Sequence, residues 1–176
     1  MKKVLATAAA LATAASMLAF APGAQADTVA TLEVTVAGTL SITAPLTADL
    51  GTLAANLSAQ DTAALGQVQV TDNRTGGILT NNWIASVRSS DFTSATTSTN
   101  LLASTINYKP GTVAVSGGIT SATPAATTAG LALDTPVVTT LATATNTASW
   151  SPVLTFVIAD TVVAGFYTGT VTHSVV

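Results

Sequence analysis

Two tryptophans and one polar turn hold the side chains in this sequence that are best suited to binding a ligand. The indole rings of Trp83 and Trp150 offer flat apolar faces that can stack on the sugar rings of a carbohydrate. Asp72 and Arg74 lie in a turn that ends in two glycines, a context typical of loops. These four residues are the candidate binding residues of the chain.

Each candidate also has a plausible structural role. Trp83 shares one face of a predicted strand with Ala85 and Val87, which favours burial in the core over contact with a ligand. Trp150, just before Pro152, begins another predicted strand, and we expect it nearer the rim of the domain. Asp72 stands among amide side chains, where a turn or cap role is favoured over a ligand role.

The sequence lacks the groupings that catalysis or metal binding requires. His173 is the only histidine, no Gly-x-Ser-x-Gly elbow accompanies it, and its place on a predicted strand favours a half-exposed structural residue. Without cysteine, a histidine cluster or an Asp-x-Asp-x-Asp run, we expect no metal and no cofactor. The aspartates are scattered singly, so a glycosidase with paired carboxylates is the least favoured alternative. We therefore expect no catalytic residues and a protein that is not an enzyme.

The composition indicates what kind of elements must position the candidates. Threonine supplies 34 of 176 residues and 48% of the chain is hydrophobic. Threonine and valine favour pleated surfaces, and this much apolar content argues against a disordered stalk, so we expect an all-β protein. Lys and Arg number 5 against 8 Asp and Glu, and two of the lysines stand at the N-terminus. With no basic cluster, nucleic acid and anionic lipid are not expected partners.

The N-terminal segment has the pattern of a cleavable secretory signal peptide, residues 1–26. Lys2 and Lys3 precede an uncharged stretch over 4–20, and Ala24-Gln25-Ala26 forms a small-x-small cleavage site. The stretch is too short and too rich in alanine for a spanning helix, so we expect secretion and no membrane insertion after cleavage. Because we find neither a cysteine for lipid attachment nor a sorting-type C-terminus, a surface role would rest on non-covalent contacts.

Alternating apolar and polar residues predict a series of short strands. The alternation is found over 31–36, 40–42, 67–71, 83–88, 106–108, 113–115, 153–158 and 167–175. The stretches 44–64 and 120–148 are less regular, and we expect long loops that hold short strands there. Short strands with spaced turns favour one domain over 27–176, a two-sheet β-sandwich with Greek-key-like connections. A closed barrel is the alternative.

The central block resembles the WxL surface domain of Gram-positive bacteria. The resemblance rests on Leu65-Gly66-Gln67-Val68-Gln69-Val70-Thr71-Asp72-Asn73-Arg74, on Trp83-Ile84-Ala85-Ser86-Val87 and on Ser90-Asp91-Phe92-Thr93. Residues 164–171 are similar to the closing strand of that family. Ala85 stands where the family has leucine, and His173-Ser174-Val175 stands where a second Trp-x-Leu is expected.

The resemblance implies a β-rich extracellular protein that binds the cell wall non-covalently, often alongside membrane-anchored partner proteins. We therefore expect a wall polymer such as peptidoglycan, or a surface protein, as the partner. The alternative is a structural subunit that self-associates through exposed strand edges, since low charge leaves such edges poorly defended. An oligomer is therefore an open possibility.

Overall fold

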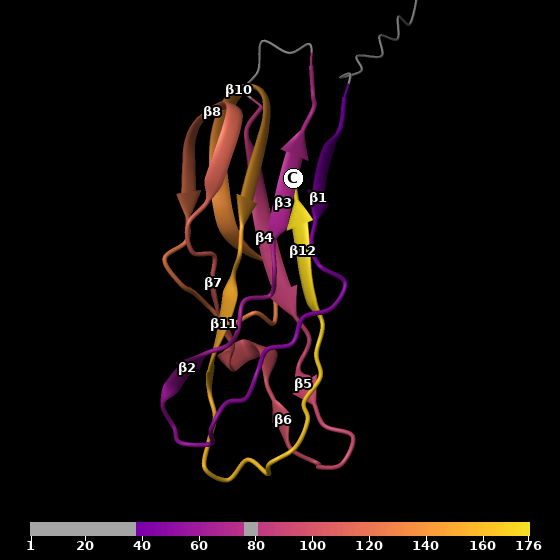
Figure 1. Ribbon diagram of the computed structural model, residues 1–176, viewed down its shortest axis with the longest axis vertical. Coiled ribbons are helices and arrows are strands. Elements are labelled where there is room, and N and C mark those ends of the chain that lie inside the picture. The colour runs from indigo at the N-terminus through magenta and orange to yellow at the C-terminus, as the bar shows by residue number, and fades with distance from the viewer. Residues whose placement is uncertain (1–37, 76–80) are drawn as a thin grey trace, which may run out of the picture. The chain divides into compact units, whose positions relative to one another are not determined.

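The computed structural model describes residues 38–75 and 81–176, and these residues form an all-β protein with one short 3-10 turn (Figure 1). Six of the described strands make the largest sheet: β1 (Leu40–Thr43), β3 (Val68–Asp72), β4 (Trp83–Ser89), β8 (Ala114–Pro124), β10 (Thr135–Trp150) and β12 (Val171–Val175). Their order is β1-β3-β10-β4-β12, with β8 paired to β10, and every pair is antiparallel. The all-β class predicted from the composition is confirmed.

A second sheet contains shorter strands. Its order is β2-β11-β7-β9, made by β2 (Ala59–Asp61), β11 (Val153–Val157), β7 (Asn107–Lys109) and β9 (Thr128–Ala129). A small hairpin joins β5 (Phe92–Thr93) to β6 (Asn100–Leu101), and the 3-10 turn η1 (Ala103–Thr105) follows it. The two larger sheets contribute to one core, as in a β-sandwich.

In β3 and β4, the apolar residues of the alternating sequence pattern are the buried ones. Val68 and Val70 of β3, and Trp83, Ala85 and Val87 of β4, are all buried, whereas the residues between them are exposed or half-buried. Successive side chains of a strand point to opposite faces, so this pattern fixes which face of each strand meets the core.

The central strand is β10, which was not expected from the sequence. Residues 135–140 pair with β4, residues 146–150 pair with β3, and β8 runs beside much of its length. The prediction of long loops over 120–148 is therefore wrong. The buried positions here include Thr140, Ala142 and Asn146, which are small or polar, so the apolar alternation that marks the other strands is missing. The threonine-rich backbone is nevertheless well suited to a pleated strand.

Both tryptophans belong to the core. Trp83 and Trp150 are 1% and 2% exposed, and they share a cluster with Leu154 and Phe156 of β11. The burial favoured for Trp83 is confirmed. The expectation that Trp150 begins a strand near the rim is wrong, because Trp150 ends β10 and pairs with Val68.

Several predictions concern residues outside the described part of the chain. The signal peptide over 1–26 and the strand over 31–36 fall there, and they stay predictions, as do the Greek-key connection and the domain bounds 27–176. In the described ranges, no helix has the length and apolar character needed to cross a membrane.

Candidate functional site

An ion pair at the end of β3 forms the centre of a polar network. Asp72 is fully buried, and the chain turns back so that Arg74 meets its carboxylate with two side-chain hydrogen bonds. Arg74 Nε donates to Oδ1 at 2.9 Å and Nη2 donates to Oδ2 at 2.8 Å, while the Arg74 backbone N–H also donates to Oδ1. Burial opposes ionisation of Asp72, but the hydrogen bonds from Arg74 outweigh it and hold the pKa of this carboxyl below its ordinary value.

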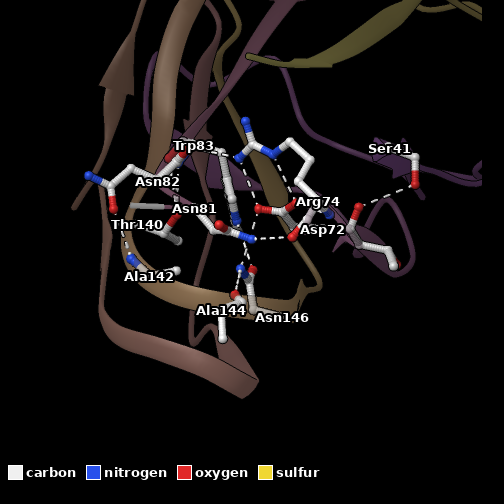
Figure 2. A network of polar contacts seen from close by, with 11 residues as sticks. Ser41, Asp72, Arg74, Asn81, Asn82, Trp83, Thr140, Ala142, Ala144 and Asn146 are labelled. Atoms are coloured by element: carbon white, nitrogen blue, oxygen red, sulfur yellow. Dashed lines mark hydrogen bonds and ion pairs between the residues drawn. The ribbon is translucent and has the colours of Figure 1, made fainter. Parts of the chain in front are cut away.

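The network continues from Asp72 to Trp83 through one asparagine (Figure 2). Trp83 Nε1 donates to Asn146 Oδ1 at 2.9 Å, and Asn146 Nδ2 donates to the Ala144 carbonyl at 2.9 Å and to Asp72 Oδ2 at 3.4 Å. The three side chains come from β3, β4 and β10. Since each polar atom in this buried set has a partner, the network ties these strands together without an unpaired group.

Two asparagines attach the residues before β4 to the same network. Asn81 Nδ2 donates to the Arg74 carbonyl at 2.8 Å, and Arg74 Nη2 donates to the Asn82 carbonyl at 3.0 Å. Asn82 Oδ1 accepts the backbone N–H of Ala142 at 2.9 Å. Arg74, Asn81 and Asn82 are thereby attached to one another and to β10 through side-chain hydrogen bonds.

A second polar chain crosses between the two larger sheets. Trp150 Nε1 of β10 donates to the Tyr108 hydroxyl of β7 at 2.8 Å, and this hydroxyl lies 3.0 Å from Nε2 of His173 on β12. Burial raises the pKa of Tyr108 and lowers the pKa of His173 to about 4, so both side chains are neutral near pH 7. His173 Nδ1 is buried and has no hydrogen-bond partner among the described residues.

Three of the four sequence candidates come together, and the fourth lies apart. Trp83, Asp72 and Arg74 share one network, whereas Trp150 belongs to the chain through Tyr108. Arg74 is the most accessible of the four, with 29% of its side chain exposed. Both indole rings are enclosed by the core, and their assignment to ligand binding stays a prediction.

Little in the sequence indicates the residues that complete these networks. Asn146 lies in a Thr/Ala-rich stretch and Tyr108 in a short strand, and neither spacing nor composition links them to Trp83 or Trp150. The described residues contain no group of three or more His, Cys, Asp or Glu side chains that could hold a metal ion. His173 is half-buried on β12, which agrees with the half-exposed strand residue that we expected.

The chain matches the model of one protein family. The model of the WxL domain, described as surface cell wall-binding, matches residues 15–161. The match covers most of the chain, so the chain belongs to the WxL family. No curated protein and no solved structure gave a match. Membership of this family indicates a partner in the cell wall and a location at the cell surface.

The two short motifs of the resemblance lie on neighbouring strands. Trp83-Ile84-Ala85 opens β4 and His173-Ser174-Val175 closes β12, and the two strands are antiparallel neighbours in the larger sheet. Ala85 pairs with Val175, and His173 pairs with Val87. The second motif lies beyond the residues that the family model matches.

Proposed function

We propose that this protein is exported and binds the cell wall non-covalently, by contact and without catalysis. Its membership of a family described as surface cell wall-binding carries the proposal. The secretory pattern of residues 1–26 supports export. Peptidoglycan, or a protein associated with it, is the partner that we propose.

The charge distribution supports binding through uncharged contacts. Each cation in the described ranges lies within 4.0 Å of an aspartate: Arg74 with Asp72, Arg88 with Asp134 and Lys109 with Asp61. These pairs leave no clustered positive charge in the described part of the chain to attract an anionic polymer. Hydrogen bonds and apolar contacts would therefore supply the affinity, and salt screens such contacts little.

The environment of the single histidine supports a role without catalysis. His173 is half-buried, and desolvation of its ring lowers its pKa to about 4. A general base works best with a pKa near the operating pH and needs access to the proton that it removes. His173 instead packs against the ring of Tyr108, with the two ring centroids 5.7 Å apart.

A wash experiment tests the proposal. Purified chain from Asp27 onwards is added to protein-free walls, which are sedimented and washed at low salt and at about 1 M salt, where the Debye length is about 3 Å. We expect the bound fraction to change little between the two washes. Loss of binding at high salt would contradict the uncharged mechanism, and no binding at any salt would contradict the function.

Self-association is the second candidate function, and the strand β8 favours it. Among the described residues β8 pairs only with β10, so its other edge has no strand neighbour. Its 11 residues, Ala114–Pro124, include no charged side chain. Long edges without charge are open to pairing with another chain, although the irregular ladder around Gly117 weakens the template.

The size of the protein in solution tests this second candidate. Self-association predicts a mass that rises with concentration in light scattering, and a charged residue on the edge strand should abolish the rise. Val115→Lys suits this purpose because Val115 is 46% exposed, so folding should tolerate the change. A monomer at every concentration would rule this function out.

A further inference from the structure

A shallow hollow lined by hydroxyl groups lies where β5 meets the chain leading into β12. Its lining residues are Ser90, Asp91, Thr93, Thr168, Gly169 and Thr170. A second hollow shares Ser90 and Thr170 with the first and extends to Arg88 and Thr172. Because the two hollows share these residues, we treat them as one site and name it the hydroxyl groove. Figure 1 shows the chain before β12 running beside β5.

The walls of the hydroxyl groove are held together by hydrogen bonds between the two segments. Thr93 and Thr168 exchange a pair of backbone hydrogen bonds, each 2.9 Å long. The backbone N–H of Ser90 donates to the Thr170 carbonyl, and the backbone N–H of Thr170 donates to Ser90 Oγ, both at 2.9 Å. The groove is therefore preformed, and a ligand would lose little affinity to ordering it.

Gly169 brings the two walls close together. A Cβ atom at this position would lie 2.6 Å from the ring of Phe92, closer than real contacts allow. Phe92 is itself buried and packs edge-on against Phe156, so its ring cannot move aside easily. This close approach holds Gly169, a lining residue of the groove, against the core.

An exposed aromatic ring lies close along the chain to the lining residues of the groove. Phe166 is 94% exposed and lies two residues before Thr168. The next residue, Tyr167, is half-buried, and its hydroxyl donates to the Val163 carbonyl at 2.7 Å. Because Trp83 and Trp150 are enclosed in the core, Phe166 is the aromatic ring best placed among the described residues to stack on a sugar.

A carboxylate lies in the groove as well. Asp91 is exposed, and its Oδ1 accepts the backbone N–H of Ala103 at 2.7 Å, which fixes the side chain. A carboxylate oxygen can accept more than one hydrogen bond, so Asp91 can still receive a hydroxyl group from a ligand. The hydroxyls of Thr93, Thr168 and Thr170 can both donate and accept.

We propose that the hydroxyl groove, together with Phe166 two residues before Thr168, is the site at which this protein holds an uncharged glycan chain of the cell wall. The inference rests on the proposed wall binding and names the site and the ligand class for it. Hydroxyl and carboxylate groups match the hydroxyl groups of sugars, and the aromatic ring stacks on a sugar face. Arg88 is the one cation of the groove, and it lies 3.9 Å from Asp134, so an anionic polymer is poorly matched.

Two variants with matched controls test the site. Phe166→Ala removes the exposed ring, and Leu141→Ala, a 53% exposed residue on β10, controls for loss of apolar surface. Asp91→Asn removes the charge, and Asp49→Asn is its control because Asp49 Oδ1 likewise accepts a backbone N–H, from Gly51 at 2.9 Å. All four positions are on the surface, so the variants should melt like the parent.

Binding is measured in two assays, to protein-free walls by co-sedimentation and to a hexasaccharide of N-acetylglucosamine by calorimetry. We expect Phe166→Ala and Asp91→Asn each to weaken both by roughly five- to thirtyfold, as the loss of one central contact does, while the controls bind like the parent. If the parent binds walls and both site variants bind equally well, the groove is wrong while the proposed function stands.

Three further outcomes would also overturn the site. If the control variants weaken binding as much as the site variants do, the effect is not specific to the groove. If walls bind through the groove but the hexasaccharide does not, an uncharged chain of N-acetylglucosamine is not the ligand. If the parent binds neither walls nor hexasaccharide, the proposed function and the groove both fall.

Discussion

The indole Nε1 of Trp83 on β4 donates a 2.9 Å hydrogen bond to Oδ1 of Asn146 on β10. Trp83 also pairs across the ladder with Thr140, whose hydroxyl bridges the backbone N–H and carbonyl of Trp83. Residues of β10 therefore hold both the ring and the backbone of Trp83, the tryptophan of the first family motif. Its place is that of a structural anchor, which leads to the first prediction.

Trp83→Ala should lower the free energy of unfolding by about 3–5 kcal/mol, the usual cost of removing a buried aromatic side chain. The neighbouring Ile84→Ala is the control, because Ile84 faces the other side and is 38% exposed. It should cost about 0.5 kcal/mol or less, as surface changes do. Denaturant titration of both variants measures the difference. If Trp83→Ala unfolds like the parent while wall binding disappears, Trp83 is a ligand contact.

Asp72→Asn should destabilise the protein by about 1.5–3 kcal/mol, because the change keeps the shape but leaves Arg74 without its anionic partner. Asp134→Asn offers the matched control, since its pair with Arg88 is 3.9 Å long and both side chains are more than half exposed. Exposed pairs contribute about 0–1 kcal/mol. Equal effects of the two variants on the denaturation midpoint would show that the buried network adds nothing.

Stability should fall as the pH drops from about 6.5 to about 4, because of His173. The pKa of this side chain lies near 4 when folded and near 6.5 when unfolded, so in this range the unfolded chain binds a proton that the folded chain does not. The slope should approach about 1.4 kcal/mol per pH unit in the middle of the range. Below pH 4 both states carry the proton, and His173 contributes no further change.

The variant His173→Gln isolates this contribution, because His173 is the only histidine of the chain. Unfolding measured by denaturant at several pH values should show a flatter profile between pH 6.5 and 4 for the variant than for the parent. A variant with the same slope as the parent would mean that other groups cause the loss. Asp72 has its lowered pKa in a more acidic range, where it adds a separate loss as the pH falls.

Cleavage of the N-terminal segment can be checked directly. The small-x-small pattern ending at Ala26 predicts Asp27 as the first residue of the protein recovered from culture medium or from the wall. Mass spectrometry of the intact protein reads this N-terminus. Recovery of a membrane-bound form that retains Met1 would overturn the export argument.

The sequence predicted those strands whose buried face is apolar. In β3 and β4 the buried positions are Val68, Val70, Ala85 and Val87, so a period of two is plain in the letters. In β10 the equivalent positions include Thr140 and Asn146, and no hydrophobic pattern marks them. The strand β10 differs from the others in having three neighbouring strands, β3, β4 and β8. Pairing between strands that are far apart in the sequence cannot be predicted from a short stretch of residues.

The candidate site shows the same limit. Asp72 and Arg74 are two residues apart, and their pairing follows from a turn that the sequence displays. The partners of both tryptophans come from distant strands, so no spacing could have identified Asn146 or Tyr108. The exposure of Phe166 could not be read from its neighbours either, because the apolar residues around it suggest a strand.

The position of β10 late in the chain has a consequence for the order of folding. The strand β4 has β10 and β12 as its sheet neighbours, and both follow it in the sequence. The strands β1 and β3 can pair earlier, but two strands alone are marginally stable in water. The larger sheet therefore cannot close until about residue 150 has left the ribosome, and such non-local pairing is slow. Late closure of the sheet is what the proposed export requires, because a chain that has not yet folded can pass through a narrow pore.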